Sequence, residues 1–289
     1  MTSVKAPKST TGVTMTNATK LRFLILLMLW AAAFYPVYPS LVQTWLNHSN
    51  NSHGILVPLI SLYFIWQKRE KLRQTEISNC NWGVVILASS MGFYLLSYAG
   101  SIAVISRSMI VFSLIGLVLF TLGKTVFKLL AFPLFFLIFM VPVPDSILNI
   151  VAFPLQLFAT KISSHIISAL SIPVYGEGNM LYFAQTQLEV AEACSGLRSI
   201  MALTMLSVIF LYLSDKGWLR KVILLASAIP LALIANIIRV SGTGILAHFH
   251  GEKVARGFLH EFSGLAVFAF GFILLFLEYS LLNKSGTKQ

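Results

Sequence analysis

The sequence predicts an all-α polytopic membrane protein with about eight transmembrane helices. Hydrophobic residues make up 57% of the chain and charged residues only 11%, whereas an ordinary soluble domain contains roughly 25% charged residues. Apolar stretches close to the length that crosses a bilayer, about 20 residues, recur along the chain between short polar breaks. Together these observations exclude a soluble globular domain.

Eight apolar stretches are the predicted spans, because each is long or apolar enough to form a membrane helix. The second is short and is expected to extend outward beyond Gly54. In chain order the predicted spans are residues 22–40, 55–66, 82–100, 104–122, 128–143, 197–213, 222–245 and 262–280.

The net charge of +11 is explained by membrane topology. With a cytoplasmic N-terminus, most of the 21 Lys and Arg residues fall in cytoplasmic segments, as the positive-inside rule expects. The basic charge therefore indicates orientation, and no nucleic-acid partner is expected. The same topology puts both termini in the cytoplasm and all six histidines on the outer face, which is where we expect the functional site.

The chain is predicted to consist of a disordered cytoplasmic tail (residues 1–20), one membrane domain (residues 21–281) and a short cytoplasmic tail (residues 282–289). The first tail is rich in Thr and Ser, a composition that does not form a core. Residues 31–33 are three alanines that resemble a signal-peptide cleavage site. The apolar run continues beyond them, so a retained signal anchor is expected.

The longest segment between spans is predicted to lie on the outer face. Pro142 and Pro144 should end the fifth helix. Residues 147–171 then form an amphipathic helix that lies in the interface or enters the membrane only partway, since both of its ends are outside. Residues 174–190 contain glycines and alternating side chains typical of a short hairpin. This segment leads directly to Cys194.

Cys194 is the candidate nucleophile. The chain has two cysteines, and Cys80 falls in a cytoplasmic break, so the two cannot pair and Cys194 should be a free thiol. It is predicted to begin the sixth helix, with Arg198 one turn further along the same face. A helix N-terminus and a nearby cation both lower the pKa of a thiol. A lone cysteine in an apolar helix is more often a small buried hydrophobe, but the helix-start position and the partners below favour a reactive thiol.

Arg239 is the second candidate, because an ionisable residue within a spanning segment usually marks a functional site. It lies near the outer end of the seventh predicted span, and Asn236 at i−3 shares its face. The alternative is an arginine that only extends to the outer headgroups. Gly242 and Gly244 follow and would let another backbone or a substrate approach closely.

His260 is the third candidate, at the outer start of the eighth span. A neutral imidazole can accept a thiol proton and return it to a leaving amine. His248 and His250 are rivals in the preceding loop, and with Glu252 they form a minor metal-binding alternative. The chain contains no His-Glu-x-x-His motif, and its only two aspartates fall on opposite sides of the membrane. No metal and no cofactor are therefore expected.

The three candidates belong to a pattern that resembles the exosortase/archaeosortase family of membrane cysteine peptidases. Its most specific part is the run around the cysteine, and His at the last position resembles the bacterial exosortase type. The resemblance covers roughly residues 34 to 280. It rests on residues 190–198 (Val-Ala-Glu-Ala-Cys-Ser-Gly-Leu-Arg), 236–244 (Asn-x-x-Arg-Val-x-x-Thr-Gly), His260-x-x-x-Gly264, 52–58 (Ser-His-Gly-x-Leu-Val-Pro) and 132–137 (Phe-Pro-Leu-x-Phe-Leu).

The resemblance implies Cys194 as nucleophile, Arg239 as the essential arginine and His260 as the essential histidine. Arg198, Asn236 and Ser195 are expected to support them. It further implies a protein of the bacterial inner membrane, with the site facing the periplasm. Its partners would be exported proteins that carry a C-terminal sorting signal, made of a short Pro-Glu-Pro-like motif, a transmembrane helix and a basic cluster.

The first hypothesis is thus a cysteine protease or transpeptidase that processes such a signal. Nothing in the sequence decides between water and an amine as the acceptor, and the oligomeric state is open. One alternative is a transporter or channel with Arg239 and Arg198 as an anion site, although no discontinuous-helix repeat is visible. Another is a non-catalytic component of exopolysaccharide export.

Overall fold

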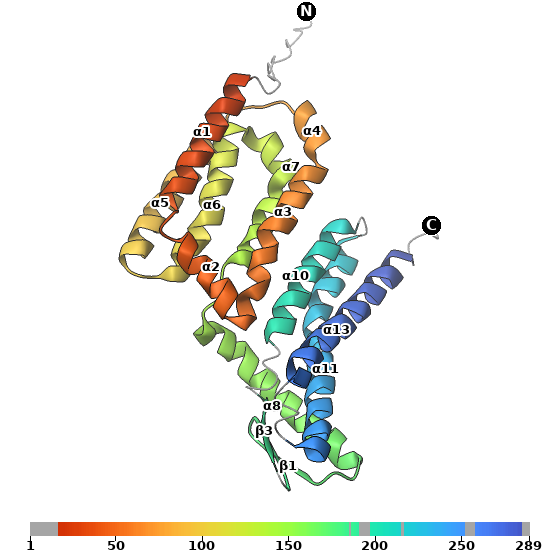
Figure 1. Cartoon of the computed structure of the whole chain (residues 1–289). Coiled ribbons are helices and arrows are strands. Elements are labelled where there is room, and N and C mark those ends of the chain that lie inside the picture. Colours follow the sequence, from red (N-terminus) through yellow and green to blue (C-terminus); the bar gives the residue numbers. More distant parts are fainter. Residues whose placement is uncertain (1–16, 185, 191–196, 215–216, 252–257, 285–289) are drawn as a thin grey trace, which may run out of the picture. The chain divides into compact units, whose positions relative to one another are not determined.

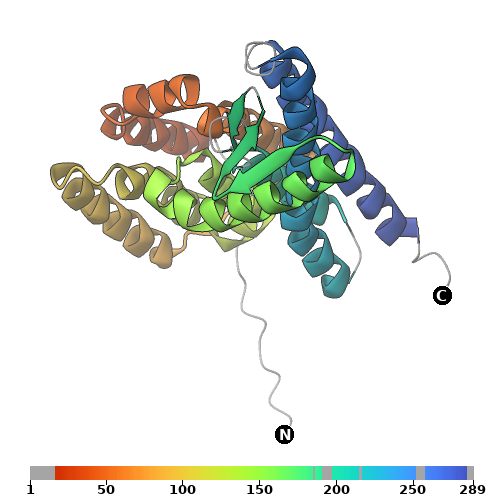
Figure 2. The same cartoon turned by 90° about the horizontal axis from the view of Figure 1, so that it is seen from below.

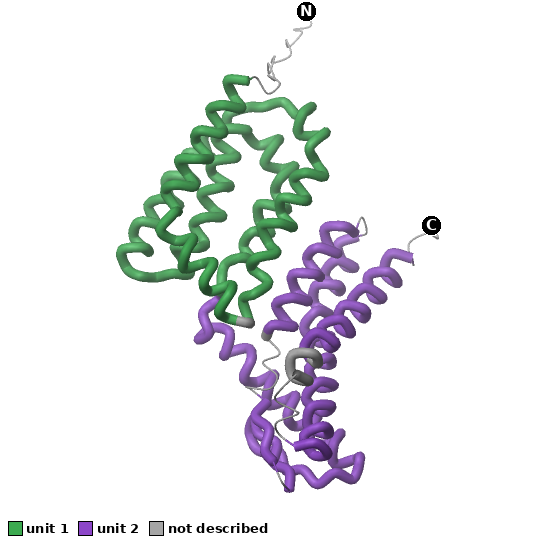
Figure 3. Tube along the Cα trace, in the orientation of Figure 1, with its two compact units in different colours: residues 1–142 green, residues 143–289 purple. Residues whose placement is uncertain are grey.

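The structure of the protein is a computed structural model that describes residues 17–184, 186–190, 197–214, 217–251 and 258–284. The chain forms two compact units, Met1–Pro142 (unit 1) and Val143–Gln289 (unit 2) (Figure 3). Cys194, Arg239 and His260 all belong to unit 2. Each unit is therefore described by itself.

Unit 1 is a bundle of helices (Figure 1). The long apolar helices α5 and α6 pack against each other along their length, and α3 packs against α7. The elements in chain order are α1 (Asn17–Ala33), α2 (Tyr38–Asn47), η1 (Ser49–Ile55), α3 (Leu56–Gln67), α4 (Arg69–Gln74), α5 (Asn81–Ala99), α6 (Ala103–Thr121), α7 (Gly123–Phe136) and η2 (Leu137–Met140).

The predicted first span, residues 22–40, is wrong as a single helix. α1 ends at Ala33 and α2 continues after a bend of 67°. Pro36 lies in the break and cannot donate a helical hydrogen bond. Arg107 of α6 stabilises the bent arrangement, since its guanidinium donates to the Ser40 carbonyl at 3.3 Å and the Thr44 hydroxyl at 3.2 Å.

Small residues let α5 and α6 approach closely. A Cβ added to Gly83 would overlap the backbone of Phe120, and one added to Gly116 would lie 2.6 Å from the backbone nitrogen of Leu87. Close contact through small residues is a common way to pack membrane helices, because lipid offers no hydrophobic driving force between them.

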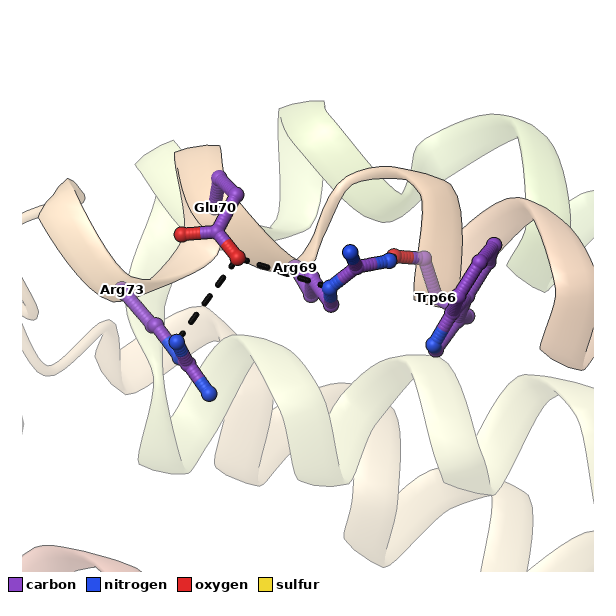
Figure 4. Close-up of polar contacts among 4 residues, drawn as sticks. All are labelled: Trp66, Arg69, Glu70 and Arg73. Atoms are coloured by element: carbon purple, nitrogen blue, oxygen red, sulfur yellow. Dashed lines mark hydrogen bonds and ion pairs between the residues drawn. The ribbon is translucent and has the colours of Figure 1, made fainter.

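The junction of α3 and α4 has the composition of a membrane–water boundary. Glu70 lies 3.4 Å from Arg69 and 3.6 Å from Arg73, and the Arg69 guanidinium is 4.1 Å from the ring centre of Trp66 (Figure 4). These side chains are exposed, so the ion pairs add little stability. Trp and Arg side chains of this kind are enriched at bilayer interfaces.

Unit 2 begins with a long helix and a small sheet. The two prolines at 142 and 144 precede α8 as predicted, and the predicted hairpin is confirmed with a third strand added. The strands form an antiparallel sheet in the order β1-β2-β3, with Tyr175 opposite Tyr182 and Leu181 opposite Leu188. These elements are α8 (Asp145–Ala169), β1 (Val174–Glu177), β2 (Met180–Phe183) and β3 (Gln187–Glu189).

One face of the sheet is buried against two helices. Leu181, Leu188 and Val190 form a cluster with Ile167 of α8 and Val240 of α11 (Trp218–His250). Seen from below, the strands lie alongside α8 and close to α11 (Figure 2). The first loop residue between β1 and β2 is Gly178, whose φ of 59° is the conformation that a two-residue hairpin loop requires.

Three apolar helices complete unit 2: α10 (Leu197–Leu213), α11 and α13 (Phe258–Lys284). They run in alternating directions (Figure 1). Their core includes Leu203, Leu224 and Leu275, all nearly inaccessible to solvent. The rings of Phe210 and Tyr279 stack with centroids 4.8 Å apart. Consequently the start of α10, the second half of α11 and the start of α13 lie toward the end of unit 2 that carries the sheet.

The predicted fold class is confirmed, whereas the count of eight spans is not. Among the described residues, six helices are long and apolar enough to cross a membrane, or seven if the bent pair counts as one span. α3 has 12 residues, or about 18 Å of helix against the roughly 30 Å of a bilayer core, and α10 is also short. α8, predicted to lie at the interface, has the length and composition of a span.

Candidate active site

The predicted site residues differ in how far the structure describes them. Cys194 and Ser195 lie outside the described residues. Arg198 is the second residue of α10 and is exposed. Its predicted position on the same helical face as Cys194 depends on undescribed residues and stays a prediction. His260 is the third residue of α13, which agrees with the prediction that it begins the last span.

Arg239 contacts α13 at Gly264. Atom Nη2 of its guanidinium lies 3.5 Å, and Cζ 3.8 Å, from the position that a Cβ would take on Gly264. Gly264 follows His260 by four residues, and residues at i and i+4 lie on the same side of a helix with Cβ positions about 5–6 Å apart. The guanidinium therefore lies against the side of α13 to which residue 260 belongs, one turn further along.

Asn236 is buried in α11 one turn before Arg239. Next to it, the carbonyl of Ile237 accepts a hydrogen bond from the Ser163 hydroxyl of α8 at 3.3 Å. This bond ties the two helices together beside the arginine. Ser241, one residue past Val240, is also buried, and its hydroxyl has no hydrogen-bond partner among the described residues.

The two glycines after Arg239 have different surroundings. A Cβ on Gly244 would lie 2.9 Å from Ile167 and 3.1 Å from the ring of Phe183, so its missing side chain lets α8 and the sheet pack against α11. A Cβ on Gly242 would meet no atom of the described chain within 4 Å. The predicted close approach is thus confirmed as protein packing at Gly244, whereas no described residue approaches Gly242.

The sheet brings the chain that precedes Cys194 close to Arg239. Val190 is fully buried in the cluster that contains Val240, the residue after Arg239. Only residues 191–196 separate Val190 from the start of α10. The segment that carries Cys194 is therefore fixed at both of its ends within unit 2.

The two rival histidines are not in a loop, contrary to the prediction. α11 continues to His250, so both His248 and His250 lie in its last turn. The His248 ring packs near Phe183, with centroids 6.4 Å apart. Glu252 lies outside the described residues. Within the described part of the chain, no group of three potential metal ligands comes together.

A second histidine motif occurs in unit 1, within residues 52–58. A Cβ on Gly54 would overlap the indole of Trp45, so only glycine fits below this ring. The indole nitrogen donates to the Met140 carbonyl at 2.9 Å. His53 is buried, and burial lowers its pKa below the ordinary value of 6.5, which keeps the imidazole neutral near pH 7. The carbonyls of Asn50 and Phe139 oppose this shift more weakly.

Gly264 is the site residue that reasoning from sequence did not assign a role. The spacing of four residues from His260 was visible, and it places the two positions on one helix face. The contact with Arg239 could not be foreseen, because it depends on how α11 and α13 pack against each other.

A model of the transmembrane exosortase family (Exosortase_EpsH) matches residues 45–277. The match covers most of the chain and includes Cys194, Arg239 and His260. The protein belongs to the transmembrane exosortase family. No curated protein and no solved structure matches the chain.

Proposed function

We propose that this protein is a cysteine peptidase or transpeptidase that processes the C-terminal sorting signal of exported proteins through Cys194, Arg239 and His260. The observation that carries the proposal is the contact of the Arg239 guanidinium with Gly264, one helical turn from residue 260, in a member of the exosortase family. A cation held at this place is suited to stabilise negative charge beside a histidine.

The length of the chain supports a role for Cys194 at the same place. Four residues separate it from Val190, so its Cα lies at most about 14 Å from that of Val190. Val190 packs in one cluster with Val240, the neighbour of Arg239. This short connection to a residue packed beside the neighbour of Arg239 supports the proposal that Cys194 acts together with the guanidinium.

The proposed chemistry is an acyl transfer. His260 accepts the proton of the Cys194 thiol, and the thiolate sulfur attacks the scissile carbonyl carbon to form a tetrahedral oxyanion. Arg239 stabilises the oxygen on which the charge develops. The C–N bond then breaks, His260 gives its proton to the departing amine, and the carbonyl remains on Cys194 as a thioester. Water or another amine resolves the thioester and regenerates the thiol.

The proposed supporting residues act through these three. Asn236 is buried one turn from Arg239, so it is suited to fix the position of α11 around the arginine. Arg198 and Ser195 would favour the thiolate form of Cys194. No cofactor is needed for the reaction.

The proposed setting is the bacterial inner membrane, with both termini in the cytoplasm and the site at the periplasmic face. The charge distribution of the sequence supports this orientation. A substrate with a transmembrane helix and a basic end would leave that end in the cytoplasm and present its motif at the outer interface.

Co-expression with an exported protein that carries such a signal tests the proposal. C-terminal trimming, scored by intact mass, is expected for the wild type and lost for Cys194→Ala, Arg239→Ala and His260→Ala, while each variant still inserts into the membrane. Normal trimming by Cys194→Ala would refute the mechanism. A periplasmic thiol reagent that blocks solute flux without a trimming defect would instead favour a transporter.

A further inference from the structure

Within the described part of the chain, the outer edge of β3 carries main-chain groups without a strand partner. Among the described residues β3 pairs only with β2. The amide of Val190 donates to the carbonyl of Asn179, and the amide of Phe183 donates to the carbonyl of Thr186, both at 2.8 Å. Antiparallel strands alternate between groups that face the partner and groups that face away. The N–H and C=O groups of Gln187 and Glu189 therefore point to the free edge.

The side chains of β3 alternate between the buried face and the other face of the sheet. Leu188 is buried, whereas Gln187 is exposed and Glu189 is partly exposed. The Glu189 carboxylate accepts a hydrogen bond from the Asn179 amide at 3.2 Å, a contact that does not use the main chain of Glu189. Exposed edges of this kind pair readily with another extended chain.

We propose that the edge of β3 binds an extended segment of the protein substrate as a fourth strand, through main-chain hydrogen bonds at Gln187 and Glu189. The inference rests on the function proposed above, and it names how the substrate is held. Two N–H and two C=O groups spaced two residues apart match the period of an extended backbone, as in other cases of strand addition. A compact ligand has no such repeat.

The edge of β3 lies close along the chain to the candidate site, which indicates that the strand it binds belongs to the substrate. Glu189 precedes the predicted nucleophile by five residues, and the buried face of the same sheet packs on Val240, next to Arg239. Five extended residues span about 17 Å. A substrate strand paired with this edge would therefore have its paired residues within about five residues of the scissile bond.

Methylation of individual peptide nitrogens in the substrate tests the proposal directly. The probe is a synthetic peptide copying the cleavage region of the co-expressed substrate, with one N-methyl group moved along successive residues. The purified full-length protein should lose about two- to tenfold in kcat/KM at every second residue, because each lost hydrogen bond is worth that much. The proposal would be overturned if kcat/KM showed no alternation between successive N-methyl positions within five residues of the cleaved bond.

Proline substitutions in β3 test whether its outward N–H groups bind the substrate. Gln187→Pro and Glu189→Pro each remove an N–H from the free edge and should raise KM about two- to tenfold with little change in kcat. Val174→Pro is the matched control, because it removes an outward N–H from the opposite edge strand, β1, and should leave KM unchanged. Unchanged KM in both edge variants would overturn the proposal.

The outcome is separable from that of the proposed function. Normal trimming by Cys194→Ala refutes the function itself. If Cys194→Ala abolishes trimming but the N-methylated peptides show no alternating loss of kcat/KM and the two edge prolines do not change KM, only strand addition is refuted.

Discussion

Enlarging Gly264 tests whether the contact of Arg239 with α13 positions the guanidinium for chemistry. Gly264→Ala adds a Cβ that lies 3.5 Å from Nη2 of Arg239, an ordinary van der Waals distance. Alanine should therefore leave the guanidinium in place. It should also stabilise α13 by up to about 1 kcal/mol, the difference in helix propensity between alanine and glycine.

Gly264→Leu has a different consequence, because its branched end would enter the space of the guanidinium. The three nearest atoms to the Cβ position are Nη2, Cζ and Nη1 of Arg239, at 3.5, 3.8 and 3.9 Å. The arginine must then move away from α13. Displacing a group that stabilises an oxyanion costs about 10²–10³-fold in kcat, so Gly264→Leu should approach the loss expected for Arg239→Ala. Because both changes remove one interaction, the double variant should be no worse than Arg239→Ala.

The assay is the rate of peptide cleavage by purified protein, measured together with thermal unfolding. Gly271→Ala is a matched control on the same helix. Its Cβ would lie 2.9 Å from the end of the Leu203 side chain in the core of unit 2, so it alters packing away from Arg239 and should leave kcat of the folded protein unchanged. If Arg239→Ala inactivates the protein but Gly264→Leu keeps the wild-type kcat, the contact at Gly264 does not position the guanidinium for chemistry.

Three further predictions concern unit 1. Burial lowers the pKa of His53, so the folded unit binds fewer protons than the unfolded chain as the pH falls. The contribution of the buried, neutral His53 to stability is complete above about pH 6.5, and it is lost as the pH falls toward the pKa of the folded state. The unfolding temperature of His53→Gln should thus change less between pH 7 and pH 5 than that of the wild type. An equal change in unfolding temperature for both proteins would contradict this. Gly83→Ala should lower the free energy of unfolding by about 1–3 kcal/mol, because its Cβ would overlap the α6 backbone. The control Gly92→Ala should not destabilise the protein, because its Cβ would meet no atom of the described chain within 4 Å. Equal unfolding temperatures of these two variants would contradict the close packing of α5 and α6. Arg107→Leu should release α2, and hydrogen exchange of residues 38–47 should accelerate; unchanged exchange would show that Arg107 does not hold the bend.

The composition was enough to predict the class of fold, because an apolar chain with few charges can satisfy its backbone in lipid only through helices or a closed barrel. Local signals also predicted the hairpin, where Gly178 adopts a positive φ, and the break before α8 at two prolines. These features depend on a few neighbouring residues. The match of the family model to residues 45–277 then confirmed the family that the sequence motifs had indicated.

Features that depend on tertiary packing were not predictable. Apolar composition alone did not reveal that residues 22–40 bend, since the bend is stabilised by Arg107 from a distant helix. The continuation of α11 to His250 was hidden by polar residues that are typical of loops. The contact between Arg239 and Gly264 joins two helices whose relative rotation no local pattern specifies. The family was thus recognisable from the sequence motifs, whereas the packing around Arg239 was not.

Mass spectrometry of the rapidly quenched protein detects the thioester that Cys194 is proposed to form with the substrate. With the cleavage-region peptide present, the account predicts an acyl adduct on the tryptic peptide containing Cys194 that is removed by neutral hydroxylamine. The buried Cys80 is the internal control and should stay unmodified. Complete trimming of the peptide by Cys194→Ala, or turnover by the wild type with no hydroxylamine-sensitive adduct on Cys194 under any quench time, would contradict the account.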